Sequence, residues 1–304
     1  MAGIITSAAF AKALWPGVNA WYGKAYNDYA VEYDKLFDKF TSRKAFEEDV
    51  GITSFGLAQV KPEGAGIAYD SENQTWTSRY QHVVYALGFI ITEELMEDDL
   101  YDVVGQRRAH GLARSIRQTK EVIGANVYNR AFNSAYVGGD GVSLLNAAHP
   151  NYAGGSWSNV LATPADLSEA ALEQAYIDIS LLRDDRGLLI QVMPNKLIIP
   201  PQLKWEADRI LKTEGRVGTD LNDINAIKAE GIFPGGVHVN HYLTDPDAWF
   251  IRTNVENGMK YFERRPDRFQ TDNDFDTSNA KFKADSRYSF GWTDPRGLFG
   301  SPGA

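Results

Sequence analysis

Residues 93–134, EELMEDDLYDVVGQRRAHGLARSIRQTKEVIGANVYNRAFNS, decide the fold. Acidic residues crowd the first turns of this stretch and basic residues follow, which matches the dipole of an α-helix. Thr92, just before it, is a suitable N-cap. A helix of this length would span about 60 Å, whereas helices average about 11–12 residues. We therefore expect one long helix, which Gly105, Gly111 and Gly124 would weaken.

An aromatic stripe precedes this helix, in residues 19–46. Its rings follow one another at intervals of three or four residues, so a helix would place them on one face. The rings are Tyr22, Tyr26, Tyr29, Tyr33, Phe37 and Phe40. We expect an amphipathic helix. Its periodicity alone favours docking on the core of its own chain, and the alternative is an arm on a neighbouring subunit.

Residues 52–91 lie between these two segments and have the pattern of an extended hairpin. Pro62, Gly64 and Gly66 mark a bend, and apolar residues then alternate from Gln81 to Ile91. A long two-stranded ribbon is marginally stable in water unless it packs on something. We expect this ribbon to join a sheet or to lie on another molecule.

The second half of the chain alternates between helix and strand patterns. Turn residues fill 137–165, and a helix is expected over 166–186 with Asp166 or Ser168 near its cap. Strands are expected at 196–199, 236–242 and 249–253, and closing strands at 259–262 and 279–292. This alternation predicts a mixed α/β lobe.

Composition excludes several classes of protein. The 304 residues carry a net charge of −9 and no cysteine. An acidic chain is a poor coat for DNA, because like charges repel and few counterions are released. The lack of cysteine excludes disulfides and thiolate metal sites. No run of about 18 apolar residues is present, so no membrane span is expected.

The candidate chemical motifs are weak. His238 and His241 would lie on opposite faces of a strand, which disfavours a shared metal. Asp272, Asp274 and Asp276 resemble the start of a calcium loop, but Thr277 and Lys283 replace the required Gly and Glu. The basic residues Arg264, Arg265 and Arg268 are interleaved with Glu263 and Asp267, which favours a salt-bridged surface over a nucleic-acid patch. We expect no catalytic residue, no cofactor and no metal.

The order of the elements resembles the capsid subunit of the Hong Kong 97 fold, in which an arm, an extended loop and a spine helix precede a mixed lobe and terminal strands. Three parts of the chain are also similar to major head proteins of tailed bacteriophages. They are LNAAHPNYAGG (145–155) followed by NVLATPADLSEAALEQA (159–175), NHYLTDPDAWFIRTNVENGMKYFERRP (240–266) and DNDFDTSNAKFKADSRYSFGWTDPRGLFGS (272–301). The resemblance covers nearly the whole chain.

The resemblance implies an α+β fold of the Hong Kong 97 type with five parts. They are an N-terminal arm (1–51), an extended β-hairpin loop (52–91), a peripheral domain with the spine helix (93–165), a mixed α/β axial domain (166–254) and C-terminal strands that return to the peripheral domain (255–304). On neighbouring subunits, the arm and the ribbon would find the partners that they lack in a monomer. The expected subunit-interface residues are Tyr22, Tyr26, Tyr29, Tyr33, Phe37, Phe40, Trp76 and Tyr80.

By the same resemblance, the chain is a structural subunit and not an enzyme. It would assemble into hexamers and pentamers of an icosahedral head in the bacterial cytoplasm and enclose double-stranded DNA without sequence-specific contact. Because the arm begins within about 20 residues of Met1, we expect a separate scaffolding protein, together with a portal. A decoration protein is left open. Lys61, the sole lysine in 52–91, is a candidate for a covalent crosslink. We favour an ordinary solvated lysine at this position over a crosslinking one, because the crosslinking reaction needs a desolvated, deprotonated amine.

Three rival functions stay open. The first is an encapsulin-type nanocompartment of the same fold, which would enclose cargo enzymes. The second is a mixed α/β enzyme with a mobile lid at 52–91, for which the sequence offers no convergent set of titratable residues. The third is a structural protein of a phage tail or baseplate.

Overall fold

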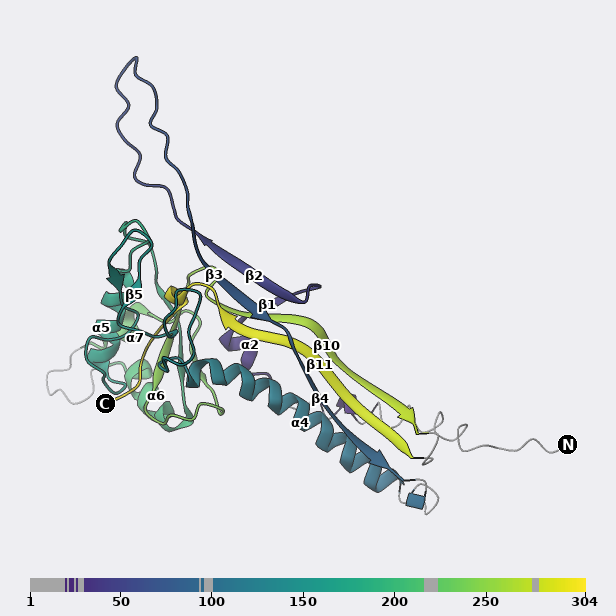
Figure 1. Ribbon diagram of the computed structural model, residues 1–304. Helices are drawn as coiled ribbons and strands as arrows, with labels where there is room; N and C mark the ends of the chain where they lie inside the picture. Colours follow the sequence, from purple (N-terminus) through teal and green to yellow (C-terminus); the bar gives the residue numbers. More distant parts are fainter. Residues whose placement is uncertain are drawn as a thin grey trace.

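The computed structural model describes residues 20, 22–24, 26, 30–92, 94–95, 101–215, 224–274 and 279–304. The molecule has three parts, a narrow loop that projects from one end, an elongated layer of sheet and helix, and a rounded lobe (Figure 1). This shape is far from that of a compact enzyme, and it places much of the chain away from a common centre.

The elongated layer is a four-stranded sheet with a long helix along one face (Figure 1). Its strand order is β1 (Asp38–Thr41), β10 (Met259–Asn273), β11 (Ala280–Trp292) and β4 (Val83–Ile91). β1 is parallel to β10, and the other two pairs are antiparallel. Leu112, Ala113 and Ile116 of the helix pack against Phe269 and Ala284 of the sheet.

The helix, α4 (Tyr101–Asn129), confirms that a long helix occupies this stretch, but it ends at Asn129 and not at residue 134, and residues 93 and 96–100 of the expected helix lie outside the described residues. Its 29 residues span about 43 Å. Gly105, Gly111 and Gly124 lie inside it without ending it. Gly124 has a packing reason, because a Cβ there would lie 3.3 Å from the Cβ of Tyr33, which crosses the helix at this point.

The rounded lobe is built on a second sheet, with the order β12 (Leu298–Ser301), β9 (Trp249–Thr253), β7 (Pro194–Ile199) and β8 (Val237–Val239). Its helices are α5 (Glu169–Ser180), α6 (Lys204–Lys212) and α7 (Ala226–Glu230). Ser168 caps α5 by accepting a bond from the amide of Ala171, as the sequence predicted. Leu172, Ile179, Leu197 and Trp249 form its core. The expected mixed α/β lobe is confirmed, although β8 is shorter than expected.

A second core joins the lobe to the sheet layer. Tyr128 near the end of α4 packs on Phe37 of the arm and on Phe250 of the lobe. Leu298, which begins the last strand, belongs to the same cluster. Short elements complete the lobe: β5 (His149–Pro150), β6 (Ser156–Trp157), and the 3₁₀ turns η1 (Pro201–Leu203) and η2 (Pro295–Gly297).

The prediction of one amphipathic helix over 19–46 is wrong, because residues 30–32 interrupt the helix and the chain is extended from Phe37 onwards. Residues 20, 22–24 and 26 are helical, and α2 (Tyr33–Leu36) is a single helical turn. Phe37 is then extended, and β1 pairs with β10. Aromatic spacing alone does not detect this change, because the partner strand lies more than 200 residues later in the chain. Tyr29 lies outside the described residues.

The expected single hairpin over 52–91 is also wrong in extent. The paired ribbon is β2 (Phe46–Ile52) with β3 (Gln74–Gln81), and it begins before residue 52. Residues 53–73 form the projecting loop, and β4 belongs to the four-stranded sheet. His82 alone lies between β3 of the ribbon and β4 of the sheet, and residues 42–45 lie between β1 of the sheet and β2 of the ribbon.

Candidate assembly surfaces

The projecting loop, residues 53–73, carries apolar side chains that its own chain does not cover. Leu57 is 79% exposed and Val60 is 94% exposed, and Phe55, Ile67 and Tyr69 are also exposed. The loop extends beyond the rest of the molecule (Figure 1). Soluble monomers rarely keep so many large apolar side chains in water on one segment. This loop is therefore the first candidate surface for contact with another molecule.

The foot of the loop is fastened to the lobe by one carboxylate. Asp70 accepts bonds from the amides of Gly56 and Ser71, both 2.8 Å long, and pairs with Arg186 of the lobe at 2.5 Å. Arg186 also donates to the carbonyl of Ser71. The two amides and the guanidinium together lower the pKa of Asp70. This clamp orients the loop without burying it.

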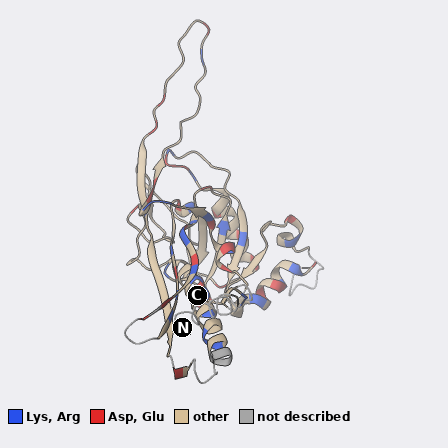
Figure 2. Ribbon diagram, turned by 90° about the vertical axis from the view of Figure 1, so that its right-hand side faces the viewer, with Lys and Arg blue, Asp and Glu red and all other residues tan. Residues whose placement is uncertain are grey.

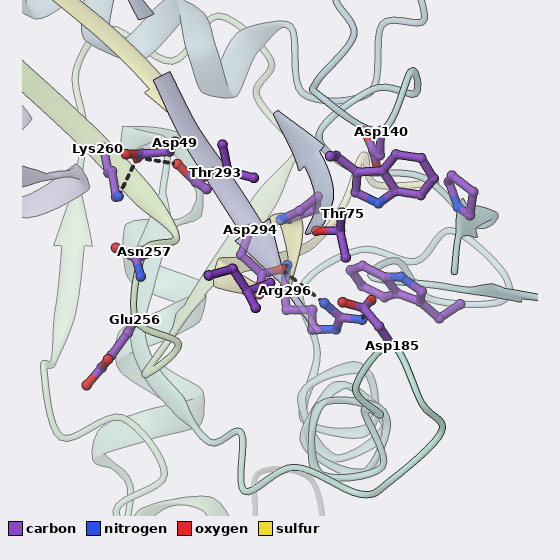
Figure 3. A pocket seen from close by; sticks show the side chains of 17 residues that line it. Asp49, Thr75, Asp140, Asp185, Glu256, Asn257, Lys260, Thr293, Asp294 and Arg296 are labelled. Carbon is purple, nitrogen blue, oxygen red and sulfur yellow. Dashed lines mark hydrogen bonds and ion pairs between the residues drawn. The ribbon is translucent and has the colours of Figure 1, made fainter. Parts of the chain in front are cut away.

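A polar pocket of about 380 Å³ lies beneath the foot of the loop (Figure 3). On one side, Lys260 pairs with Asp49 of β2 at 2.5 Å, and Thr293 donates to the same carboxylate at 2.9 Å. Thr293 in turn shares a 2.6 Å hydrogen bond with the hydroxyl of Tyr80 in β3. These side chains bind one another, so the group acts as a structural tie between the ribbon and the sheet.

The other side of the pocket ties the ribbon end of the sheet to the lobe. Arg296 pairs with Asp185 at 3.0 Å, and its guanidinium lies 4.6 Å from the centre of the Trp157 ring (Figure 3). Asp294 accepts a bond from the amide of Arg296, and burial raises the pKa of its carboxyl despite the nearby guanidinium. The pair of Arg296 and Asp185 joins two distant parts of the chain, which is the arrangement of a structural support.

The arm is held on α4 by buried polar groups. Glu121 accepts bonds from the amides of Glu32 and Tyr33, at 3.1 and 2.8 Å. Burial raises the pKa of Glu121, although these bonds oppose the change. Lys120, only 1% exposed, pairs with Asp267 at 2.6 Å. Burial disfavours the charge on Asp267, but Lys120 and Tyr26 outweigh it and hold the pKa below its ordinary value.

These buried polar contacts of Glu121 and Lys120 were not predicted from the sequence. Glu121 and Lys120 have the same residue types as the solvated residues around them, so residue type does not mark them as buried. Their partners lie 88 and 147 residues away. Only the pattern of apolar positions on α4 would have placed Lys120 and Glu121 on the inner face.

Seven of the eight predicted interface residues lie in the described part of the chain, and they differ in how far they are exposed. Tyr22, Tyr33, Phe37 and Tyr80 are buried against their own chain, and Tyr26 is partly buried with its hydroxyl on Asp267. Phe40 is 41% exposed and Trp76 is 37% exposed. Tyr29 lies outside the described residues. An interface role stays a prediction, and the geometry narrows it to Phe40 and Trp76, because the buried rings are already covered.

The weak motifs form no site in the described part of the chain. No group of three or more His, Asp or Glu side chains there is arranged to hold a metal. Arg265 and Arg268 both pair with Asp285, and Arg264 donates to the carbonyl of Lys44. The predicted salt-bridged surface is confirmed with a different acidic partner. Asp274 pairs with Lys281, and Asp276 lies outside the described residues.

Two further observations concern surfaces. Lys and Arg residues are interspersed with Asp and Glu over the lobe, the charged residues of α4 are mostly Lys and Arg, and the loop carries few charges (Figure 2). Among the described residues, no helix is both long enough and apolar enough to cross a membrane.

The layered sheet and spine-like helix, the mixed lobe and the projecting loop together define a class, the shell-forming subunits of the Hong Kong 97 type. A family model described as phage capsid protein matches residues 74–300. The chain belongs to this family, and it is a structural protein of a phage capsid, a component of the virion built from many copies of one subunit. The fold and family expected from the sequence are confirmed.

Solved structures agree on the fold. A structure of Mycobacterium phage Adephagia has a TM-score of 0.52 at 12% identity, covering 90% of each chain. One of Microbacterium phage Oxtober96 has a TM-score of 0.52 at 11% identity, covering 90% of this chain and 91% of the other. The capsid of a native GTA particle has a TM-score of 0.52 at 16% identity, covering 89% of each chain. No curated protein matches the chain by sequence.

Proposed function

We propose that this subunit forms the hexamers and pentamers of an icosahedral phage head that encloses double-stranded DNA. The observation that carries the proposal is the projecting loop, whose exposed apolar side chains have no cover on their own chain. Each copy that covers such a loop gains about 25 cal/mol for each Å² of apolar surface removed from water. A closed lattice repeats this gain at every subunit, so single contacts need not be strong.

The parts of the chain take the roles that the family resemblance gives them. Residues 1–51 act as the arm and 52–91 contain the extended loop. Residues 93–165 contain α4, the spine helix of the peripheral domain, and β10 and β11 return to the sheet of that domain, whereas β12 pairs with β9 in the lobe. The lobe, whose largest part is residues 166–254, gathers with its equivalents at the centre of each capsomer. The exposed rings of Phe40 and Trp76 lie on subunit contacts.

Contact with the packaged DNA is weak and independent of sequence. The net charge of −9 supports this, since like charges repel and few counterions would be released. Assembly in the host cytoplasm, with a scaffolding protein and a portal as partners, is proposed from the family resemblance. A decoration protein and a crosslink at Lys61 have no support in the contacts described above.

Negative-stain electron microscopy of the purified protein tests the proposal. Closed hollow particles of uniform size are expected. A protein that stays monomeric at high concentration, or that forms tubes, contradicts it. The contents of particles purified from infected cells separate the phage head from the nanocompartment of the same fold, because a head contains DNA and a nanocompartment contains cargo protein. The match to the phage capsid family favours the head.

A further inference from the structure

Residues 137–159, between α4 and the lobe, contain a buried polar pair that the proposed function does not use. Nδ1 of His149 lies 2.6 Å from Oδ2 of Asp140, and the two side chains are 0% and 4% exposed. The imidazole also stacks on the ring of Trp157, with the ring centres 4.5 Å apart. Aspartate is almost never fully buried unless it is paired, so the stability of this carboxylate depends on the protonation of His149.

The side chain of Asn159 fixes a hydrogen on the second nitrogen of the imidazole. Nε2 of His149 lies 3.1 Å from Oδ1 of Asn159. The amide nitrogen of Asn159 donates to three backbone carbonyls, those of Leu144, Pro295 and Leu298. Its oxygen is therefore the atom that faces His149, because the reverse orientation would place an oxygen against three oxygens. An amide oxygen only accepts hydrogen bonds, so Nε2 must donate.

These contacts count the protons on the pair. A neutral imidazole with its hydrogen on Nε2 has a lone pair on Nδ1, and an ionised carboxylate has only acceptor atoms. The 2.6 Å contact between Nδ1 of His149 and the oxygen of Asp140 therefore needs a second hydrogen between them. In either position of this hydrogen, on nitrogen or on oxygen, the pair holds one proton more than a neutral imidazole beside a carboxylate.

The charges around the pair are close to balanced when it holds this proton. Arg296 lies 4.6 Å from the centre of the Trp157 ring on which His149 stacks, and its positive charge opposes a second one on the imidazole. Asp185 at 3.0 Å and Asp294 at 3.5 Å offset the charge of Arg296 (Figure 3). The other ionisable side chains that line the same pocket are Asp49, Glu256 and Lys260.

The pair connects the support of the ribbon with the end of the chain. Asp140 belongs to a tight turn, residues 138–142, in which the amide of Gly138 donates to the carbonyl of Val142 at 2.8 Å. A Cβ on Gly139 would lie 2.8 Å from the carbonyl oxygen of Thr77 in β3, so this turn packs closely on the ribbon. On the other side of the pair, Asn159 bonds to the closing segment, as described above.

We propose that Asp140 and His149 form a proton-dependent lock, which holds the turn 138–142 against β3 and opens when the pair loses its added proton. Without that proton, a lone pair of the imidazole faces an oxygen at Nδ1 or at Nε2, and the repulsion favours separation. A closed form that binds more protons than the open form loses stability as pH rises. The lock is therefore expected to weaken above about pH 6.5, where an ordinary exposed imidazole loses its second proton. The inference concerns the single chain and does not depend on assembly.

The variant Asp140→Asn tests the lock, because its amide nitrogen can donate to Nδ1 and form the same contacts without the added proton. Hydrogen exchange of the Gly138 and Gly141 amides, both bonded within the turn, is measured on the unassembled chain from pH 6 to pH 9. Each rate is divided by that of the same amide in the variant, which removes the intrinsic effect of pH on exchange. The ratio is expected to rise with pH, by up to about tenfold for each pH unit. Asp34→Asn, an exposed carboxylate on α2, is the matched control and is expected to exchange as the natural chain does.

A ratio that stays constant from pH 6 to pH 9 overturns the proposal, and so does an equal change in the Asp34→Asn chain. If Asp140→Asn does not fold, the natural chain supplies the test by itself. Gly138 and Gly141 are then compared with Leu181, whose amide donates to the carbonyl of Ile177 at the end of α5. After correction for intrinsic rates, the two glycine amides are expected to lose protection with rising pH while Leu181 keeps it. Equal loss at all three amides overturns the lock.

Discussion

Replacing Glu121 with alanine tests whether the arm is held on helix α4 by this one carboxylate. The change removes the acceptor of two backbone amides, those of Glu32 and Tyr33, and leaves them buried without a partner. A buried donor without a partner costs about 1–3 kcal/mol. Arg117, 3.7 Å from Glu121, also loses an ion-pair partner. We expect the free energy of unfolding to fall by about 2–5 kcal/mol. This is a large fraction of the total unfolding free energy of a typical domain, which is about 5–15 kcal/mol.

Urea unfolding of the unassembled chain, followed by tryptophan fluorescence, measures this loss. Hydrogen exchange locates it, because the amides of Glu32 and Tyr33 are expected to lose protection before the rest of α4. Glu121→Gln keeps one oxygen acceptor and is expected to lose about half as much. Glu173→Ala, on the exposed face of α5, is the matched control and is expected to change stability by less than about 0.5 kcal/mol.

One result would refute the reasoning. If Glu121→Ala unfolds at the urea midpoint of Glu173→Ala, and the amides of Glu32 and Tyr33 stay protected, then the arm is held by its aromatic side chains alone.

Two further predictions concern the other ties. Asp267→Asn leaves Lys120 buried without its ion-pair partner and is expected to cost about 3–5 kcal/mol at pH 7. The pKa of Asp267 is lowered in the fold, so the stability that its carboxylate contributes is present above the ordinary pKa of 3.8 and is lost as pH falls through the lowered pKa. Urea unfolding of both chains at pH 7 and in steps below pH 4 measures this loss. A stability difference between the two chains that does not change with pH contradicts the prediction. Arg186→Ala releases Asp70 and is expected to increase proteolysis of the loop while the free energy of unfolding changes by less than about 1 kcal/mol. Arg209→Ala, in an exposed pair on α6, is its control, and equal cleavage of the two variants counts against the clamp.

Local patterns in the sequence predicted the elements whose stability is local. The charge gradient of residues 93–134 marked α4, and β9 was expected at 249–253 and lies there. Ser168 was named as a cap and caps α5. In each case, the signal and the structure it predicts lie within one segment, so no knowledge of the rest of the chain was needed.

The failures come from contacts between distant segments. The aromatic stripe fits a helix, but β1 is a strand because β10 offers it a backbone partner. The ribbon begins at Phe46 because its partner ends at Gln81, and neither bound is visible in composition. The polar contacts of Glu121, which is buried, and of Asp70, which is exposed, both consist of ordinary surface residue types. The sequence therefore predicted the order of the parts but not the residues that hold them together.

The single residue between β3 and β4 has a consequence for shells whose subunits occupy places of unequal curvature. His82 belongs to neither ladder, and its imidazole bonds only to the hydroxyls of Ser42 and Ser289, at 3.1 and 2.9 Å. A change of inclination at this residue, together with residues 42–45 that join β1 to β2, would leave every backbone bond within the ribbon and within the sheet intact. The free-energy cost of this bending would come only from side-chain contacts between the ribbon and the sheet, such as those of Tyr80 and Asp49. One polypeptide would thus fit several local geometries by bending at one joint, without refolding either piece.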